Sequence, residues 1–345
     1  MSNSGDYDIF VAKYDADGKL LWVRSAGGKG YDYAHGIAVD AGGNAFVTGA
    51  LVGDGAFGDL KVIAAGGSHA FCARYDSVGR LLWAKTAEGN ARGSGHGIVL
   101  DGAGNAYVGG SSGGAGTMGG VTLTNALGRD LFIAKFTAEG KVAWIHEGHG
   151  STHAMVHEIT SDRAGNVWAA GMFKGVLKLG DRTVTSHGDN DLLLTSLDPT
   201  GKRLWTRTGG GPRVDYGLGV ATDGAGNSFL TGEFTDTAEI AGASITSSGS
   251  TEIYVAKLDR AGSLRWLTQG GGKKGDNAYP IVADAQGNLY LSGNISGPRS
   301  SARTPSPARA ATTFTSPSLR RSDAARRDQT RKAVQPQIHT DRHRW

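Results

Sequence analysis

Five tryptophans stand 61 residues apart in this chain, with no insertion or deletion between them. Each one ends a segment of similar sequence, and these segments are Asp8 to Trp22, His69 to Trp83, Asp130 to Trp144, Asp191 to Trp205 and Glu252 to Trp266. A fixed period of this length predicts a repeat architecture, in which each copy is one structural unit that packs on the next. We therefore expect one quasi-symmetric domain, residues 1–296, followed by a tail, residues 297–345.

The tail differs from the repeats in composition. From residue 298 onward it has no glycine, five of the eight prolines, and eleven Lys and Arg against three Asp, which gives a net charge of +8. The residues before it carry a net charge of −4, so the overall +4 does not describe a basic, nucleic-acid-binding body. We expect a disordered tail and no nucleic-acid partner.

The tail also prompts a hypothesis about the gene. A sixth copy of the repeat would begin near residue 313, where the tail reads Thr312 to Ser318. Shifting the reading frame of codons that could encode this stretch gives Asp-Val-Tyr-Val-Ala-Lys, which is close to the segment at residues 252–257. We hypothesise that a frame change near Gly297 replaced a further unit with this Pro/Arg-rich tail.

Each repeat begins with a predicted hairpin. Residues 8–14 carry apolar side chains on both faces of an extended strand, which is typical of a sheet covered on both sides. A glycine then recurs where a hairpin bulge needs positive φ, at Gly18, Gly79, Gly140, Gly201 and Gly262. The next strand carries the periodic tryptophan, whose expected role is packing between neighbouring units.

A second predicted hairpin follows, at residues 36–40 and 45–49 of the first repeat. Its turn holds an aspartate and, three and four residues later, Gly43 and Asn44; the aspartates are Asp40, Asp101, Asp162, Asp223 and Asp284. Such an aspartate can accept hydrogen bonds from the turn's backbone amides, whereas one Asp and one Asn are too few ligands for calcium. Four short strands per repeat predict an all-β fold, namely a β-propeller of five 61-residue repeats.

The two ends of the repeat region suggest how such a propeller would close. The hairpin at residues 8–24 lacks the inner partner that the hairpin at residues 280–294 could supply. We expect these hairpins to pair and close a five-bladed ring, and an open arc cut from a larger propeller is the alternative.

The repeat also resembles a known family. The pattern D-x-F-V-A-K-x-D-x-x-G-x-L-x-W, followed by G-I-A-V-D-x-x-G-N-x-Y-V-T-G, is similar to the bacterial SBBP β-propeller repeat and covers residues 6 to about 296. The resemblance implies a propeller, often part of a long secreted or surface-attached protein, and it implies no catalytic residues. Residues 1–6 show no signal-peptide pattern, so a secreted or cell-surface location is expected for the parent protein only.

Histidines supply the candidate ligand-binding residues. His35, His96 and His157 occupy one repeat position, which holds Leu218 and Tyr279 in the other two copies. If this strand is innermost, the candidates His35, His96, His157 and Tyr279 surround one mouth of a central channel, where imidazoles could bind a metal or an anion or could simply pack. The third repeat adds His146, His149 and His153 with Glu147 and Glu158, in a loop-like sequence that is unlike a helical zinc motif.

These observations lead to a non-enzymatic function. Ser, His and Asp are too scattered for a nucleophilic triad, and no catalytic, metal or cofactor site is predicted. The lone Cys72 lies in a strand-like segment and is expected to be a small buried side chain, and no apolar run reaches membrane-spanning length. We expect a monomeric surface or extracellular scaffold, adhesive or glycan-binding, with a protein or glycan ligand at its loop face. The alternative is a propeller lyase or hydrolase with its site at the channel mouth.

Overall fold

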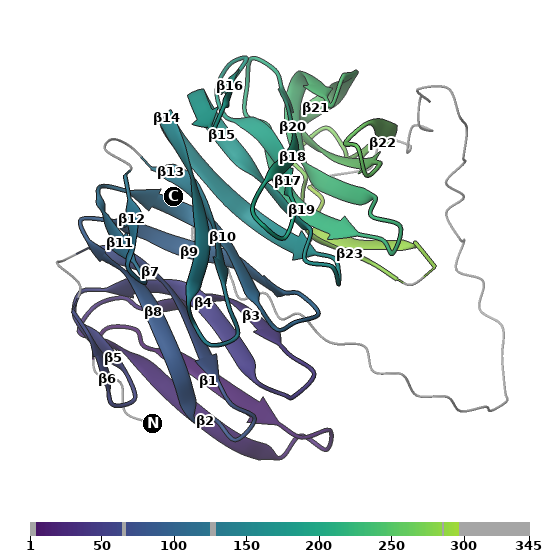
Figure 1. The fold of residues 1–345 in the computed structure, drawn as a ribbon. Helices are drawn as coiled ribbons and strands as arrows, with labels where there is room; N and C mark the ends of the chain where they lie inside the picture. Colours follow the sequence, from purple (N-terminus) through teal and green to yellow (C-terminus); the bar gives the residue numbers. More distant parts are fainter. Residues whose placement is uncertain (1–4, 64–66, 125–128, 285, 297–345) are drawn as a thin grey trace, which may run out of the picture.

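The computed structural model describes residues 5–63, 67–124, 129–284 and 286–296. In these ranges the chain forms 24 strands joined in antiparallel sheets and no helix, so the predicted all-β class is confirmed (Figure 1). Accordingly, the described ranges contain no apolar helix of membrane-spanning length. The tail at residues 297–345, and with it the predicted frame change, lies outside the described residues.

Four groups of four antiparallel strands, here called units A to D, make up most of the molecule. Unit A comprises β3 (Tyr33–Val39), β4 (Ala45–Val52), β7 (Ser68–Tyr75) and β8 (Leu81–Gly89). Unit B comprises β9 (Arg92–Leu100), β10 (Ala106–Gly113), β13 (Asp130–Phe136) and the first half of β14 (Val142–Ser161). Unit C comprises the second half of β14, β15 (Val167–Leu179), β17 (Asp191–Leu197) and β18 (Arg203–Gly210). Unit D comprises β19 (Tyr216–Thr222), β20 (Ser228–Ile240), β21 (Ala243–Leu258) and β22 (Leu264–Gly270).

Two pairs of strands lie at the ends of this series. The N-terminal pair is β1 (Ile9–Tyr14) with β2 (Leu20–Gly28), and the C-terminal pair is β23 (Asn277–Ala283) with β24 (Leu289–Asn294). Short strands extend some of the outer edges: β5 (Gly55–Phe57), β6 (Leu60–Val62), β11 (Gly116–Met118), β12 (Val121–Leu123) and β16 (Arg182–Thr185). The hairpin of β5 and β6 pairs with β2, and that of β11 and β12 pairs with β8.

The predicted turns form as expected. In the second hairpin Asp101 accepts hydrogen bonds from the backbone N–H and the Nδ2 of Asn105, at 2.9 and 2.8 Å, and Gly104 has a φ of +78°. The same pair of bonds recurs at Asp40, Asp162, Asp223 and Asp284. In the first hairpin the register shifts at a bulge, between Lys135 and Phe136 for example, next to a glycine with positive φ. These turns therefore follow from local sequence.

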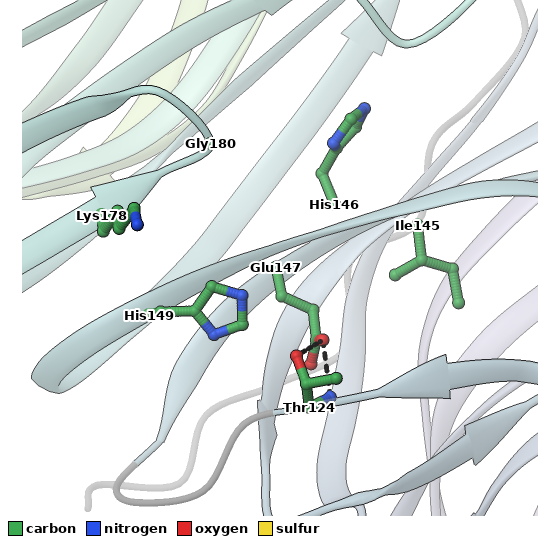
Figure 2. Close-up of a pocket in the computed structure, with 7 residues that line it drawn as sticks. All are labelled: Thr124, Ile145, His146, Glu147, His149, Lys178 and Gly180. Carbon is green, nitrogen blue, oxygen red and sulfur yellow. Dashed lines mark hydrogen bonds between the residues drawn. The ribbon is translucent and has the colours of Figure 1, made fainter.

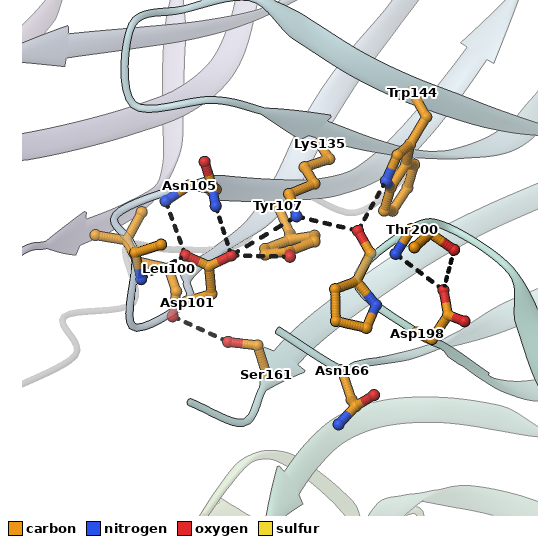
Figure 3. A network of polar contacts seen from close by, with 12 residues as sticks. Leu100, Asp101, Asn105, Tyr107, Lys135, Trp144, Ser161, Asn166, Asp198 and Thr200 are labelled. Carbon is orange, nitrogen blue, oxygen red and sulfur yellow. Dashed lines mark hydrogen bonds and ion pairs between the residues drawn. The ribbon is translucent and has the colours of Figure 1, made fainter. Parts of the chain in front are cut away.

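The periodic tryptophans join neighbouring units, as predicted. The indole N–H of Trp144 donates to Pro199 O, 55 residues further on, at 3.4 Å, and Lys135 Nζ donates to the same carbonyl at 3.0 Å (Figure 3). Equivalent indole bonds are made by Trp22, Trp83 and Trp205. The ring of Trp205 also lies against Gly262, where an added Cβ would come within 2.6 Å of it. The turn glycine is thus required both for its positive φ and for the approach of the tryptophan.

A third recurring contact was not anticipated from the sequence. Asp32, Asp215 and Asp276 are buried, and each accepts two backbone N–H bonds, one of them from the residue four positions earlier. Burial raises the pKa of Asp215 to about 6 although these bonds act in the opposite direction. These aspartates fix the connection between one unit and the first strand of the next. The same position holds Gly93 and Ala154 before units B and C, where β9 and β14 run through it as strands.

The hydrophobic core lies between units rather than inside any single sheet. One cluster joins Phe46 and Cys72 of unit A to Val108 and Phe132 of unit B, and similar clusters join units B and C and units C and D. Cys72 is buried there, as predicted. Units A to D are therefore covered on both faces, which explains the apolar residues on both sides of their strands.

The predicted pairing of the two end hairpins is wrong for this structure. β1 pairs with β2 and β24 pairs with β23, and the sheets that contain them are separate. In Figure 1 the N-terminal strands and β23 lie at the two ends of an open series of units. The outward edges of β1 and β24 carry no partner strand within the described part of the chain.

Candidate functional site

The first strands of successive units lie next to one another. β3, β9, the second half of β14, β19 and β23 are in contact in chain order, and they line one side of the molecule (Figure 1). Glycines allow this approach: a Cβ on Gly97 would come within 3.0 Å of Ile159 on the next first strand. This arrangement brings one repeat position of each unit close to the same position of its neighbours.

A row of five rings follows from this arrangement. The ring centroids of His35 and His96 lie 5.6 Å apart and those of His96 and His157 lie 6.5 Å apart. Tyr33 continues the row beyond His35 at 6.1 Å, and Tyr216 continues it beyond His157, also at 6.1 Å. All five side chains belong to half-buried residues. We call Tyr33, His35, His96, His157 and Tyr216 the ring row.

The structure thus brings three of the four predicted site residues together. The fourth, Tyr279, is exposed on β23 and makes none of the ring contacts of the row. Leu218, at the histidine position of unit D, is buried instead, and Tyr216 occupies the end of the row. Tyr216 stands three repeats after Tyr33, so the spacing of these two tyrosines was the signal that sequence reasoning missed.

Burial keeps the histidines of the row uncharged at neutral pH. It lowers the pKa of His96 to about 3 and that of His157 to about 4, with neighbouring positive groups acting in the same direction, and it lowers the pKa of His35 as well. His157 Nε2 is buried and has no hydrogen-bond partner among the described residues. The row therefore presents neutral rings and imidazole nitrogens rather than a cationic site for anions.

An acidic side chain lies beside the last ring. Glu233 on β20 is the cross-strand partner of Tyr216, and Asn190 Nδ2 donates to the Tyr216 hydroxyl at 3.3 Å. Burial raises the pKa of Glu233 to about 7, and burial, with a smaller contribution from Glu233, raises the pKa of Tyr216. This end of the row therefore combines a carboxyl group that titrates near neutral pH with a hydroxyl, an amide and an imidazole.

The histidine-rich segment of the third repeat divides between two places because β14 passes through two units. His146 and His149 lie in the first half of β14, in a pocket of about 590 Å³. The lining of this pocket includes Glu147, Lys178 and Thr124 (Figure 2). Glu147 accepts hydrogen bonds from the Thr124 backbone N–H and hydroxyl, at 2.8 and 3.2 Å. His157 lies in the second half of β14 and belongs to the ring row. His146 and His149 are thus separated from His157.

No metal centre emerges from these groups. In the described ranges, no three or more His, Cys, Asp or Glu side chains are placed to hold a metal ion together. The repeated turn aspartates already accept hydrogen bonds from their own turns, as Asp101 does from Asn105 and Tyr107 (Figure 3).

Comparison with known proteins adds little to this site. Neither the protein-family models nor the curated protein sequences give a match to the chain. A solved structure from Bacteroides caccae, described as a protein of unknown function, is similar over 77% of this chain and 92% of its own, with 10% identity and a TM-score of 0.32. A likeness of this degree carries no argument about fold or function.

Proposed function

We propose that this chain is a non-enzymatic interaction scaffold of the β-propeller type, which binds an uncharged, polyhydroxylated ligand such as a glycan along the ring row. The observation that carries this proposal is the row itself: five neutral, half-buried rings lie side by side on the first strands of successive units. Aromatic side chains with a few polar groups between them are the usual lining of ligand sites.

The propeller assignment rests on the repeat and on how the units are built. Five copies at a 61-residue spacing, four antiparallel strands in each of units A to D, and adjacent first strands are all features of propeller blades. The strands that correspond to a fifth blade lie in two separate sheets at the two ends of the series. The resemblance to the SBBP repeat points the same way and supports a surface or extracellular location.

The electrostatics of the row favour a neutral ligand. Because His96 and His157 are uncharged at pH 7, an anion would gain no ion pair from them. Ring faces can instead contact the C–H face of a sugar, while imidazole nitrogens and tyrosine hydroxyls exchange hydrogen bonds with its hydroxyls. This supports a glycan over an acidic peptide.

A glycan array probed with the full chain tests the proposal. We expect discrete glycan hits, and we expect Tyr216→Ala to weaken binding to them at least about tenfold, since a few aromatic side chains carry most of the binding energy of a site. Tyr279→Ala is the matched control, because this tyrosine also lies on a first strand but outside the row. An array without hits, or equal losses for the two variants, would refute binding along the ring row.

The enzyme alternative has one observation in its favour, the carboxyl group of Glu233 with a pKa of about 7 beside Tyr216. A group that titrates near the working pH suits general acid–base catalysis of glycan cleavage. Incubating each array hit with the protein and measuring chain length by mass spectrometry decides between the two functions. Shortened glycan chains that are absent with Glu233→Gln would establish the enzyme. Intact glycan chains would support the non-enzymatic scaffold.

A further inference from the structure

The two ends of the molecule are complementary halves of one four-stranded unit. By the 61-residue spacing, β1 and β2 correspond to β7 and β8, the third and fourth strands of unit A. In the same way, β23 and β24 correspond to β3 and β4, its first and second strands. Each end therefore lacks the strands that the other end provides.

The complete units show how such halves join. Their second and third strands pair in one register, in which Ala45 faces Tyr75, Ala106 faces Phe136, Val167 faces Leu197 and Ser228 faces Leu258. Carried over by the repeat spacing, this register places Leu289 of β24 opposite Tyr14 of β1, and Asn294 opposite Ile9. Both strands have six residues, so they match in length as well.

Apolar side chains of β1 and β24 are exposed, although their equivalents in the complete units are buried. Phe10 and Tyr14 of β1 are 65% and 60% exposed, whereas Phe71 and Tyr75, their equivalents in unit A, are 1% and 3% exposed. Tyr290 of β24 is 59% exposed, while its equivalents Phe46, Tyr107, Trp168 and Phe229 are at most 2% exposed. Apolar side chains that are buried in the complete units are therefore exposed at both ends of the molecule.

Charged groups at the two ends are complementary too. In units A, B and D a cation of the third strand lies 4.9 Å from the ring centroid of its cross-strand partner on the second, in the pairs Arg74 with Phe46, Lys135 with Tyr107, and Lys257 with Phe229. The same cation forms an ion pair with the turn aspartate of the second hairpin, as Lys257 does with Asp223 at 3.5 Å. At the ends these partners are separated, with Lys13 on β1 and Tyr290 and Asp284 at β24.

We propose that β24 of one molecule pairs with β1 of a second copy of this chain, in the register of the complete units, so that each junction completes a four-stranded unit head to tail. A second copy fits because the molecule's own ends stay apart in separate sheets, whereas another copy offers the matching edge, rings and cation. Such a contact joins two different surfaces, so it builds chains or rings of molecules. This inference differs from the monomer that the sequence led us to expect, and it does not depend on the proposed ligand.

A mixing experiment tests this directly. Full-length chains carrying Lys13→Cys, with a size tag, are mixed under mild oxidation with untagged chains carrying Tyr290→Cys, since residues facing each other across paired strands can form a disulfide. The native Cys72 is buried and does not interfere. We expect tagged–untagged dimers on a non-reducing gel, and a ladder of multimers from the double variant. If mixing gives no such dimer while the double variant gives only an internally linked monomer, the chain closes on itself and the proposal is wrong.

Sedimentation velocity without any cross-link provides the second measurement. The mass of the parent chain is expected to rise with concentration, and Phe10→Asp is expected to hold it at the monomer value, because a charge would lie in the apolar junction. Phe10 is exposed in the single molecule, so this variant should still fold. Ile63→Asp, which adds the same charge at an exposed apolar site away from β1 and β24, should associate like the parent. A parent mass that does not change with concentration would overturn the proposal.

Discussion

The interior units and the two end hairpins contain the same repeat residues in different surroundings. Phe71 in unit A is buried in the cluster that unit A forms with the N-terminal strands, while Phe10, one repeat earlier, is exposed on β1. Tyr107 and Tyr290 form a second pair of this kind. The backbone is a strand in every case, so burial here is decided by the neighbouring strands rather than by the residue or its own strand.

Local contacts behave in the opposite way. Asp284, at the exposed C-terminal end, accepts the same hydrogen bonds from Asn288 that Asp101 accepts from Asn105 in the interior. These bonds span four residues, so they do not need a neighbouring unit. The comparison separates what a repeat determines alone, its turns, from what it gains by stacking, its core.

Replacing a phenylalanine at both positions should give the largest difference. Phe71→Ala should lower the free energy of unfolding by about 3–5 kcal/mol because it leaves a cavity between units, whereas Phe10→Ala should lower it by less than about 0.5 kcal/mol. Urea unfolding of the dilute, monomeric chain measures both values. A large loss from Phe10→Ala would mean that β1 is covered in solution.

Removing the charge of Glu233 should have a smaller effect that depends on pH. Because burial raises the pKa of this carboxyl group to about 7 from 4.5, the folded state holds its proton more tightly than the unfolded state. The contribution of this protonated carboxyl group to the free energy of unfolding is fully present below pH 4.5, and it is lost as the pH rises through 7. Glu233→Gln should therefore stabilise the fold by on the order of 2 kcal/mol at pH 8 and change little at pH 4.

The end of the chain supplies the contrast for this prediction. The repeat position of Glu233 holds the exposed Asn294 on β24, and Glu239 is an exposed acid on the same strand as Glu233. Glu239→Gln should show no such difference between pH 4 and pH 8. Urea midpoints across this pH range measure both variants, and parallel curves for the two would rule out a buried carboxyl group at residue 233.

Removing one hydroxyl should give the smallest effect. The Tyr107 hydroxyl donates to Asp101 Oδ2 at 3.0 Å next to Lys135, and the equivalent bond from Tyr290 to Asp284 is 3.3 Å and exposed to water. Tyr107→Phe should cost about 1–2 kcal/mol because it leaves a buried acceptor with one donor fewer, and Tyr290→Phe should cost less than about 0.5 kcal/mol. Thermal unfolding measures both, and equal costs would show that neighbouring units do not strengthen this bond.

The sequence predicted part of the candidate site. The repeat spacing correctly placed His35, His96 and His157 at one structural position, and their rings do lie in a row. It could not show that Leu218 is buried at this position in unit D while Tyr216 extends the row, because burial and ring contacts depend on the neighbouring strands. Nor could it show that β14 passes through two units and separates His149 from His157.

The sequence by itself determined the features that depend on near neighbours in the chain. These are the 61-residue unit, the Asp–Asn and glycine turns, the alternation of strands, and the tryptophan that reaches the next turn. The tertiary structure alone decided which faces are covered, how strongly burial shifts the pKa of His96 and Glu233, and that the two end hairpins do not pair. The physical reason is that hydrogen bonds within a turn are fixed by a few residues. Desolvation and strand-edge pairing instead depend on groups that lie far apart in the chain and are brought together only by packing.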